Sequence, residues 1–176
     1  MIQTLPGLDI KQRADLIMVD NMTDETQKLV IRRAKQADLK QIIALDEKVS
    51  GIEKSNYLSD LFESYQTRRP DERFFNVAET VSEDSTKIAG FVIGEVRAWE
   101  FGSEPCGWVF AISVDHDLRE SGTGTALLEH LSASFREVGV HRLRTMISRD
   151  NHLLMSFFRS HGLMGGPYLQ LEKALR

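Results

Sequence analysis

The stretch VDHDLRESGTGT, residues 114–125, decides the fold that this chain is expected to adopt. It follows an apolar run typical of a β-strand, residues 107–114, and precedes residues 126–138, whose apolar side chains recur at helical spacing. Gly122 and Gly124 let the backbone approach a ligand closely and present its N–H groups. The first N–H groups of a helix lack intrahelical partners and carry partial positive charge. This strand–loop–helix junction therefore predicts a binding site for a phosphate or pyrophosphate group.

Arg119 places a permanent cation at the same junction, but two common nucleotide-binding motifs are absent. The P-loop requires a Gly-Lys pair followed by Ser or Thr, and no lysine follows Gly124. The dinucleotide fingerprint requires a third glycine at the position of Leu127. The junction is thus expected to hold a phosphorylated ligand in an arrangement different from these two.

The hydrophobic pattern on both sides of the junction predicts strands and helices along most of the chain. Strands are expected over 29–34, 74–79, 87–96, 107–114, 141–147 and 168–173, and helices over 39–49, 57–65, 126–138 and 151–160. Residues 74–96 should form an antiparallel hairpin and residues 108–147 a right-handed parallel crossover. The apolar strand 107–114 is expected to be buried on both faces. This order predicts an α+β fold, a mixed α/β layer in which helices cover a largely antiparallel sheet.

Residues 1–28 are predicted to form an N-terminal arm, and residues 29–176 the domain itself. Residues 11–19 have the pattern of one or two helical turns, and residues 21–26 are polar and turn-like. The arm is expected to pack on the domain or on a partner chain. The alternative is that it contributes to the substrate site.

The composition excludes several classes of protein. The 176 residues suffice for one domain, and 41% hydrophobic with 27% charged residues is a normal globular mixture. A net charge of −4 argues against nucleic acid as a partner. No segment approaches the ~20 apolar residues that span a bilayer, so a membrane is not expected as a partner either. The single cysteine, Cys106, cannot form an internal disulfide and fits a cytoplasmic location.

Two motifs resemble those of the GNAT acyltransferases, which transfer acetyl from acetyl-CoA. The family signature Arg/Gln-x-x-Gly-x-Gly/Ala is matched by residues 119–124, with Val114 five residues before it. The family also has an asparagine after the next strand, then an aromatic residue and a Gly-Phe ending, for which this chain has Asn151, Phe158 and Gly162-Leu163. The resemblance covers residues 29–176. It implies the GNAT acyl-CoA N-acyltransferase fold, a central, mostly antiparallel twisted sheet flanked by helices.

The resemblance also implies which residues bind acetyl-CoA. Main-chain groups of the strand should run beside the pantetheine arm, the glycine loop should hold the pyrophosphate, and the asparagine and aromatic residues should contact the pantetheine and thioester end. The implied cofactor-binding residues are Ile112, Ser113, Val114, Arg119, Glu120, Ser121, Gly122, Thr123, Gly124, Thr125, Asn151, Ser156 and Phe158. No metal is expected, because the histidines do not have metal-ligand spacing.

The implied reaction is direct attack of a primary amine on the thioester carbonyl. An ordinary ammonium has a pKa near ~10.4, so some group must accept its proton. Glu100 and Glu104 are candidate bases acting through water. The family's usual acid, a tyrosine, is replaced by Phe158, so Tyr168, Ser156 or a water molecule would protonate the leaving thiolate, or no acid is used.

The resemblance places the acceptor amine between the first two helices and the hairpins. The residues in range are Asp46, Glu47, Ser50, Tyr57 and Glu95 or Glu100, whose carboxylates would suit a cationic amine. The acceptor is expected to be a small molecule or a protein, and a homodimer is possible because many relatives form one. The alternative is a non-catalytic acyl-CoA-binding or regulatory module, since Phe158 replaces the acid and Trp108 or Cys106 replaces the family's central-strand glutamate.

Overall fold

The computed structural model describes residues 17–19, 28–69, 71–82, 85–98, 102–118 and 121–175. The chain divides into two compact units, one ending at Thr145 and the other beginning at Met146. Each unit is described by itself below. Among the described residues no helix is both long enough and apolar enough to span a membrane.

The first unit is built on a sheet whose strands lie side by side in the order in which they occur along the chain. The strands are β1 (Ile17–Val19), β2 (Lys28–Arg33), β3 (Arg73–Val81), β4 (Thr86–Arg97), β5 (Cys106–Val114) and β6 (Leu143–Thr145). All neighbouring pairs are antiparallel except β5 and β6, which are parallel. The largely antiparallel sheet, the β3–β4 hairpin and the parallel pairing across the 108–147 segment are thus confirmed.

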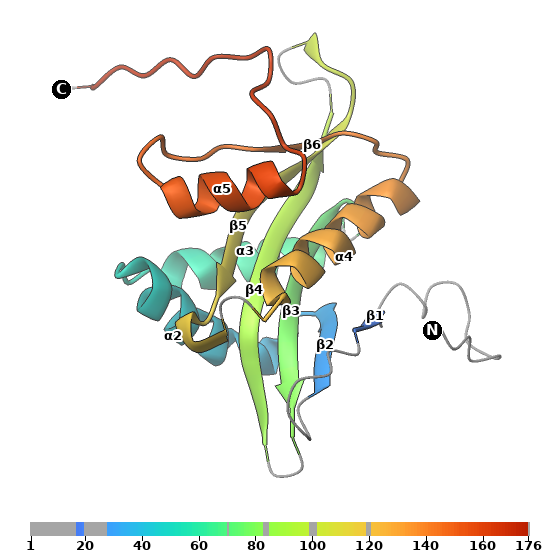
Figure 1. Ribbon diagram of the computed structural model, residues 1–176, viewed down its shortest axis with the longest axis vertical. Coiled ribbons are helices and arrows are strands. Elements are labelled where there is room, and N and C mark those ends of the chain that lie inside the picture. Colours follow the sequence, from blue (N-terminus) through green and yellow to red (C-terminus); the bar gives the residue numbers. More distant parts are fainter. Residues whose placement is uncertain are drawn as a thin grey trace. The chain divides into compact units, whose positions relative to one another are not determined.

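Helices cover both faces of this sheet (Figure 1). Those of the first unit are η1 (Gln36–Asp38), α2 (Leu39–Ser50), α3 (Ser55–Thr67), η3 (His116–Leu118) and α4 (Thr123–Glu137). On one face Ile42 and Phe62, from α2 and α3, join Phe91 and Ile93 of β4 in one buried cluster. On the other face α4 packs closely on β4, because a Cβ at Gly94 would lie only 3.0 Å from Leu131.

Two expectations about strands of the first unit are wrong. Residues 17–19 are not helical: they form β1 and pair with Leu29–Ile31 of β2. β5 is not buried on both faces, since Phe110 is 41% exposed and residues 111–114 are only partly buried. The pairing of β6 with β5 ends at Val109, so among the described residues no strand lies beside the second half of β5 on the side away from β4. This stretch is called the open edge of β5 below.

The second unit contains the helix α5 (His152–Ser160) and the residues that follow it. The Asn151 side chain caps the helix by accepting a hydrogen bond from the Leu154 N–H at 3.0 Å, and Gly162, with φ of 81°, follows its end. The strand expected over Tyr168–Lys173 is not formed. Alternating side chains give a segment an apolar face, but a strand also needs a neighbour for its backbone groups. None pairs with this segment among the described residues.

Candidate active site

The N-terminus of α4 offers main-chain N–H groups without a side-chain cap. Gly122 occupies the N-cap position with φ of 82°, a left-handed conformation that favours glycine, and has no side chain with which to cap the helix. The first intrahelical hydrogen bond runs from the Ala126 N–H to the Gly122 carbonyl at 2.9 Å. The N–H groups of Thr123 and Gly124 therefore have no carbonyl partner within their own helix. This arrangement suits an anion such as a pyrophosphate.

The second half of β5 presents main-chain groups at the open edge of the sheet. The Asp115 N–H donates to the Ala89 carbonyl of β4 at 2.8 Å. Because backbone groups alternate in direction along a strand, those of Ser113 also face β4, and those of Ile112 and Val114 face the opposite edge. β6 does not reach that part of β5, as its pairing ends at Val109 with Thr145. Of the three predicted strand residues, Ile112 and Val114 are thus the ones whose backbone can bond a ligand.

A register irregularity lies where this open edge begins. Ile93 of β4 pairs with Ala111 of β5, but Gly94 pairs with Val109, so Phe110 is an extra residue in β5. The Thr145 hydroxyl donates to the Val109 carbonyl at 3.0 Å, at the last residue pair of β5 and β6. The open edge therefore starts at a bulge, and it leads along β5 toward the N-terminus of α4.

Asp115, directly after β5, carries a buried carboxylate that sequence analysis did not single out. Its side chain is 2% exposed and contacts Lys48 of α2 at 2.6 Å and Lys87 of β4 at 2.9 Å. Hydrogen bonds from these two lysines hold the pKa of Asp115 far below its usual value, against the opposing effect of burial. The partners lie 67 and 28 residues away along the chain, so no local pattern could have indicated the cluster.

A second group of charges lies on the face of the sheet that α2 and α3 cover. The Glu95 carboxylate accepts a hydrogen bond from the Tyr65 hydroxyl at 3.2 Å, and it pairs with Arg73 at 3.4 Å and Arg97 at 3.0 Å. Burial, and next the charge of Glu95, raises the pKa of Tyr65, so its phenol stays protonated and donates. The Glu95 oxygens therefore already accept hydrogen bonds from Tyr65 and Arg97 and form an ion pair with Arg73.

Aromatic rings line the same part of the sheet. The Arg97 guanidinium lies 4.7 Å from the centre of the Phe110 ring and 5.7 Å from that of Trp108. Trp108 pairs directly with Glu95 across β4 and β5. This chain thus has a carboxylate on β4 beside the position of β5 at which the family glutamate was sought.

The residues predicted to bind the acceptor amine differ in whether their side chains can reach an incoming molecule. Asp46 is buried and pairs with Lys54 at 2.8 Å, whereas Glu47 is exposed. The Ser50 hydroxyl donates to the Ile52 carbonyl at 3.3 Å. The Tyr57 side chain, 58% exposed, is open to an incoming molecule.

The predicted catalytic and remaining cofactor residues are distributed over both units. Glu104 is exposed in the segment before β5, and Glu100, Arg119 and Glu120 lie outside the described residues. Ser121 and Thr125 belong to the glycine loop and the first turn of α4.

The second unit holds the other four predicted residues. Tyr168 is 49% exposed, Ser156 is exposed on α5, and Phe158 is buried with its ring 5.3 Å from that of Phe157. The side-chain oxygen of Asn151, Oδ1, already caps α5. The Asn151 side chain can therefore offer a ligand its amide N–H groups and the second lone pair of Oδ1.

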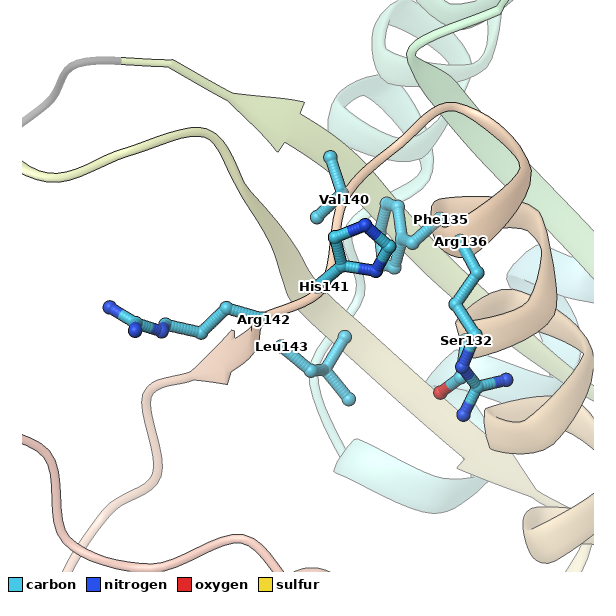
Figure 2. Close-up of a pocket in the computed structure, with 7 residues that line it drawn as sticks. All are labelled: Ser132, Phe135, Arg136, Val140, His141, Arg142 and Leu143. Carbon is cyan, nitrogen blue, oxygen red and sulfur yellow. The ribbon is translucent and has the colours of Figure 1, made fainter.

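A cavity of about 140 Å³ lies near the other end of α4 (Figure 2). It is lined by Ser132, Phe135, Arg136, Val140, His141, Arg142 and Leu143. Figure 2 shows that Arg142 points away from the other lining residues. The cavity is separate from the glycine loop and contains none of the predicted site residues. Among the described residues, no group of three or more His, Cys, Asp or Glu side chains could hold a metal ion.

Comparison with known proteins places this chain in a family. The model of the acetyltransferase (GNAT) family matches residues 36–163, which is well over half of the chain. The chain therefore belongs to the GNAT family and is an N-acetyltransferase. No curated protein matches the chain.

Solved structures resemble the chain over most of its length. An aminoglycoside N-acetyltransferase, AAC(6')-Iy in complex with CoA, is 13% identical, with 87% of this chain and 99% of that chain covered and a TM-score of 0.72. Glucosamine-6-phosphate N-acetyltransferase from Arabidopsis thaliana is 22% identical, with 86% and 100% covered and a TM-score of 0.64. A transcriptional regulator from Bacillus halodurans C-125 is 15% identical, with 84% and 99% covered and a TM-score of 0.67. At these identities the likeness shows the fold, and the predicted GNAT fold is confirmed.

Proposed function

We propose that this chain transfers an acetyl group from acetyl-CoA to a primary amine of a small molecule or a protein. The observation that carries this proposal is the continuity of two features. The open edge of β5, with the main-chain groups of Ile112 and Val114, leads to the uncapped N-terminus of α4 behind Gly122. An elongated ligand with amides at one end and phosphates at the other matches both.

The fit to acetyl-CoA follows from the chemistry of these two features. The first-turn N–H groups of α4 would hold the pyrophosphate, where the helix dipole favours negative charge. The backbone of Ile112 and Val114 would bond the pantetheine amides as an added strand bonds a sheet edge. The predicted roles of Arg119 and Glu120 at the pyrophosphate, of Asn151 at the pantetheine amides and of Phe158 at the thioester end rest on the family resemblance. Ser156 stays a candidate, beside Tyr168 or a water molecule, for the acid that Phe158 cannot supply.

The chemical step joins the amine nitrogen to the thioester carbonyl carbon and breaks the carbon–sulfur bond. The nitrogen loses a proton and the sulfur leaves as a thiolate. A thiol has a pKa of about 8.5, so the thiolate leaves readily and an acid such as Tyr168 would assist rather than decide the reaction. A main-chain N–H at the open edge of β5 would stabilise the carbonyl oxygen as it gains charge. Glu104 and Glu100 stay the proposed bases, acting through water.

We also propose a cellular location and an oligomeric state for the enzyme. We place the enzyme in the cytoplasm, because its single cysteine, Cys106, is buried and cannot form an internal disulfide. A homodimer is proposed from the resemblance to a family with many dimeric members. The reaction as written needs no metal, no nucleic acid and no membrane.

The test is a panel of amines with acetyl-CoA and detection of free thiol. The panel includes an aminoglycoside and glucosamine-6-phosphate, the acceptors named for two structural neighbours, together with a lysine peptide and a peptide with a free N-terminus. We expect amine-dependent thiol release for at least one class, with one acetyl group gained by the acceptor in mass spectrometry. Thiol release that is equal with and without every amine would count against catalysis of acetyl transfer to these classes.

A further inference from the structure

Asp115 joins three elements of the first unit through its buried carboxylate. Oδ1 accepts a hydrogen bond from Lys48 Nζ, in the last turn of α2, at 2.6 Å. Oδ2 accepts one from Lys87 Nζ, near the start of β4, at 2.9 Å. Burying a carboxylate is costly unless charged partners and hydrogen bonds compensate it. Both partners stand on elements that contribute to the core, so they attach the end of β5 to the rigid part of the unit.

A chain of hydrogen bonds continues from Asp115 to the first turn of α4. The N–H groups of Asp117 and Leu118 donate to Asp115, to its Oδ1 at 3.3 Å and to its main-chain oxygen at 3.0 Å. The Ser121 hydroxyl donates to the Leu118 carbonyl at 2.6 Å and lies 2.8 Å from the Thr123 hydroxyl. The contacts therefore lead from Asp115 to Thr123, the first residue of the helix: the carboxylate holds the Asp117 N–H, and the main-chain oxygen of the same residue holds Leu118.

These contacts lie where they can align the main-chain N–H donors at the start of α4 for a ligand. Main-chain donors bind an anion well only when their directions are fixed beforehand, and a displacement of about 1 Å can cost up to a hundredfold. Gly122, in front of α4, restricts the backbone less than any other residue would. Support for the donors must therefore come from neighbouring contacts, and those of Asp115 reach the loop from the side of β5.

We propose that Asp115, held by Lys48 and Lys87, is a positioning residue for acetyl-CoA, which fixes the turn before α4 so that the helix N-terminus is aligned for the pyrophosphate. The inference rests on the proposed function. It assigns to Lys48 a part in cofactor binding, although Lys48 lies on α2, on the side of the unit where the acceptor amine is expected. Asp115 itself does not touch the reacting atoms.

The variant Asp115→Asn tests this role with little change of shape. Asparagine keeps one oxygen acceptor but loses the charge that attracts the lysines. The lysine side chains are 46% and 59% exposed, so water can hydrate them and the protein is expected to fold. The matched control is Asp38→Asn, which removes a carboxylate that is 9% exposed and pairs with Arg32 at 2.6 Å, just before the other end of α2.

The measurements are acetyl-CoA affinity by calorimetry and steady-state kinetics with the accepted amine. We expect Asp115→Asn to weaken acetyl-CoA binding by about tenfold, to raise KM for acetyl-CoA by a similar factor, and to change kcat and the KM for the amine by less than about twofold. Lys48→Met should also weaken binding, and Lys48→Arg should restore it because arginine can donate to the same carboxylate. Asp38→Asn should lower stability and leave acetyl-CoA affinity unchanged.

Two results would overturn the inference while leaving the proposed function intact. One is an acetyl-CoA affinity of Asp115→Asn equal to that of Asp38→Asn. The other is a loss of kcat with unchanged affinity. If Asp115→Asn does not fold, Lys48→Met combined with Lys87→Met decides in its place, and unchanged affinity in that variant contradicts the proposal. A wild-type chain that is folded and does not bind acetyl-CoA would instead refute the proposed function, and the positioning role with it.

Discussion

Gly124→Asp is expected to leave the protein at least as stable as the wild type while it strongly weakens acetyl-CoA binding. Gly124 is the second residue of α4, where an acidic side chain interacts favourably with the helix dipole. The dipole contributes about 0.3–1 kcal/mol, and replacing glycine inside a helix adds a few tenths. For a chain of this size the sum corresponds to a rise in Tm of about 1–4 °C.

The same carboxylate would oppose the pyrophosphate. Two unit charges about 4 Å apart repel by about 4 kcal/mol at an effective dielectric constant of ~20. Gly124 is only partly buried, so solvent screening reduces this to about 2–4 kcal/mol. The predicted effect is a Kd for acetyl-CoA about 30- to 1,000-fold higher.

The assay is calorimetric titration of acetyl-CoA, with thermal unfolding of the same samples. Gly124→Asn is the matched control, because asparagine has nearly the shape of aspartate and no charge. The difference in Kd between the two variants isolates the effect of the charge. Equal affinities for the two folded variants would refute the placement of the pyrophosphate at this helix end.

Three further predictions concern stability. The pKa of Asp115 is lowered in the folded state, so its carboxylate stabilises the fold above the unfolded pKa of about 3.9, and this stabilisation is lost as the pH falls. Urea unfolding should therefore show a larger decrease in the free energy of unfolding between pH 5 and about pH 3 for the wild type than for Asp115→Asn. Gly107→Ala should destabilise the first unit by at least about 1–3 kcal/mol, because the new Cβ would overlap the Phe135 ring; chemical denaturation that shows no loss of stability would contradict this packing. Asn151→Ala should cost about 1 kcal/mol in the second unit by removing the cap on Leu154, and hydrogen exchange should show faster opening of α5 only.

The amino-acid sequence predicts those parts of the fold that depend on hydrophobic periodicity and turn residues within short stretches. The strand–loop–helix junction around Gly122 and the β3–β4 hairpin were both predictable, because periodicity and turn residues act over short stretches. The helix expected over 151–160 is also found, as α5, and Asn151 caps its start. The main-chain groups proposed to bind acetyl-CoA lie within the junction around Gly122 and the strand before it.

The features that sequence missed depend on contacts between distant residues. The alternation over Tyr168–Lys173 predicted a strand, but pattern alone does not supply the neighbour that a strand requires. Likewise the apolar run of β5 predicted full burial, whereas Phe110 is 41% exposed and the four residues after it are only partly buried. Asp115 could not be paired with its two lysines before the fold brought α2, β4 and β5 together.

The central claim is most directly tested by calorimetric titration of acetyl-CoA into the purified chain, with ATP and NAD as controls. The account predicts saturable binding of acetyl-CoA at one site per chain and much weaker binding of both controls. A folded sample that does not bind acetyl-CoA, or binds ATP equally well, would contradict the assignment of the β5 edge and the α4 N-terminus as its binding site.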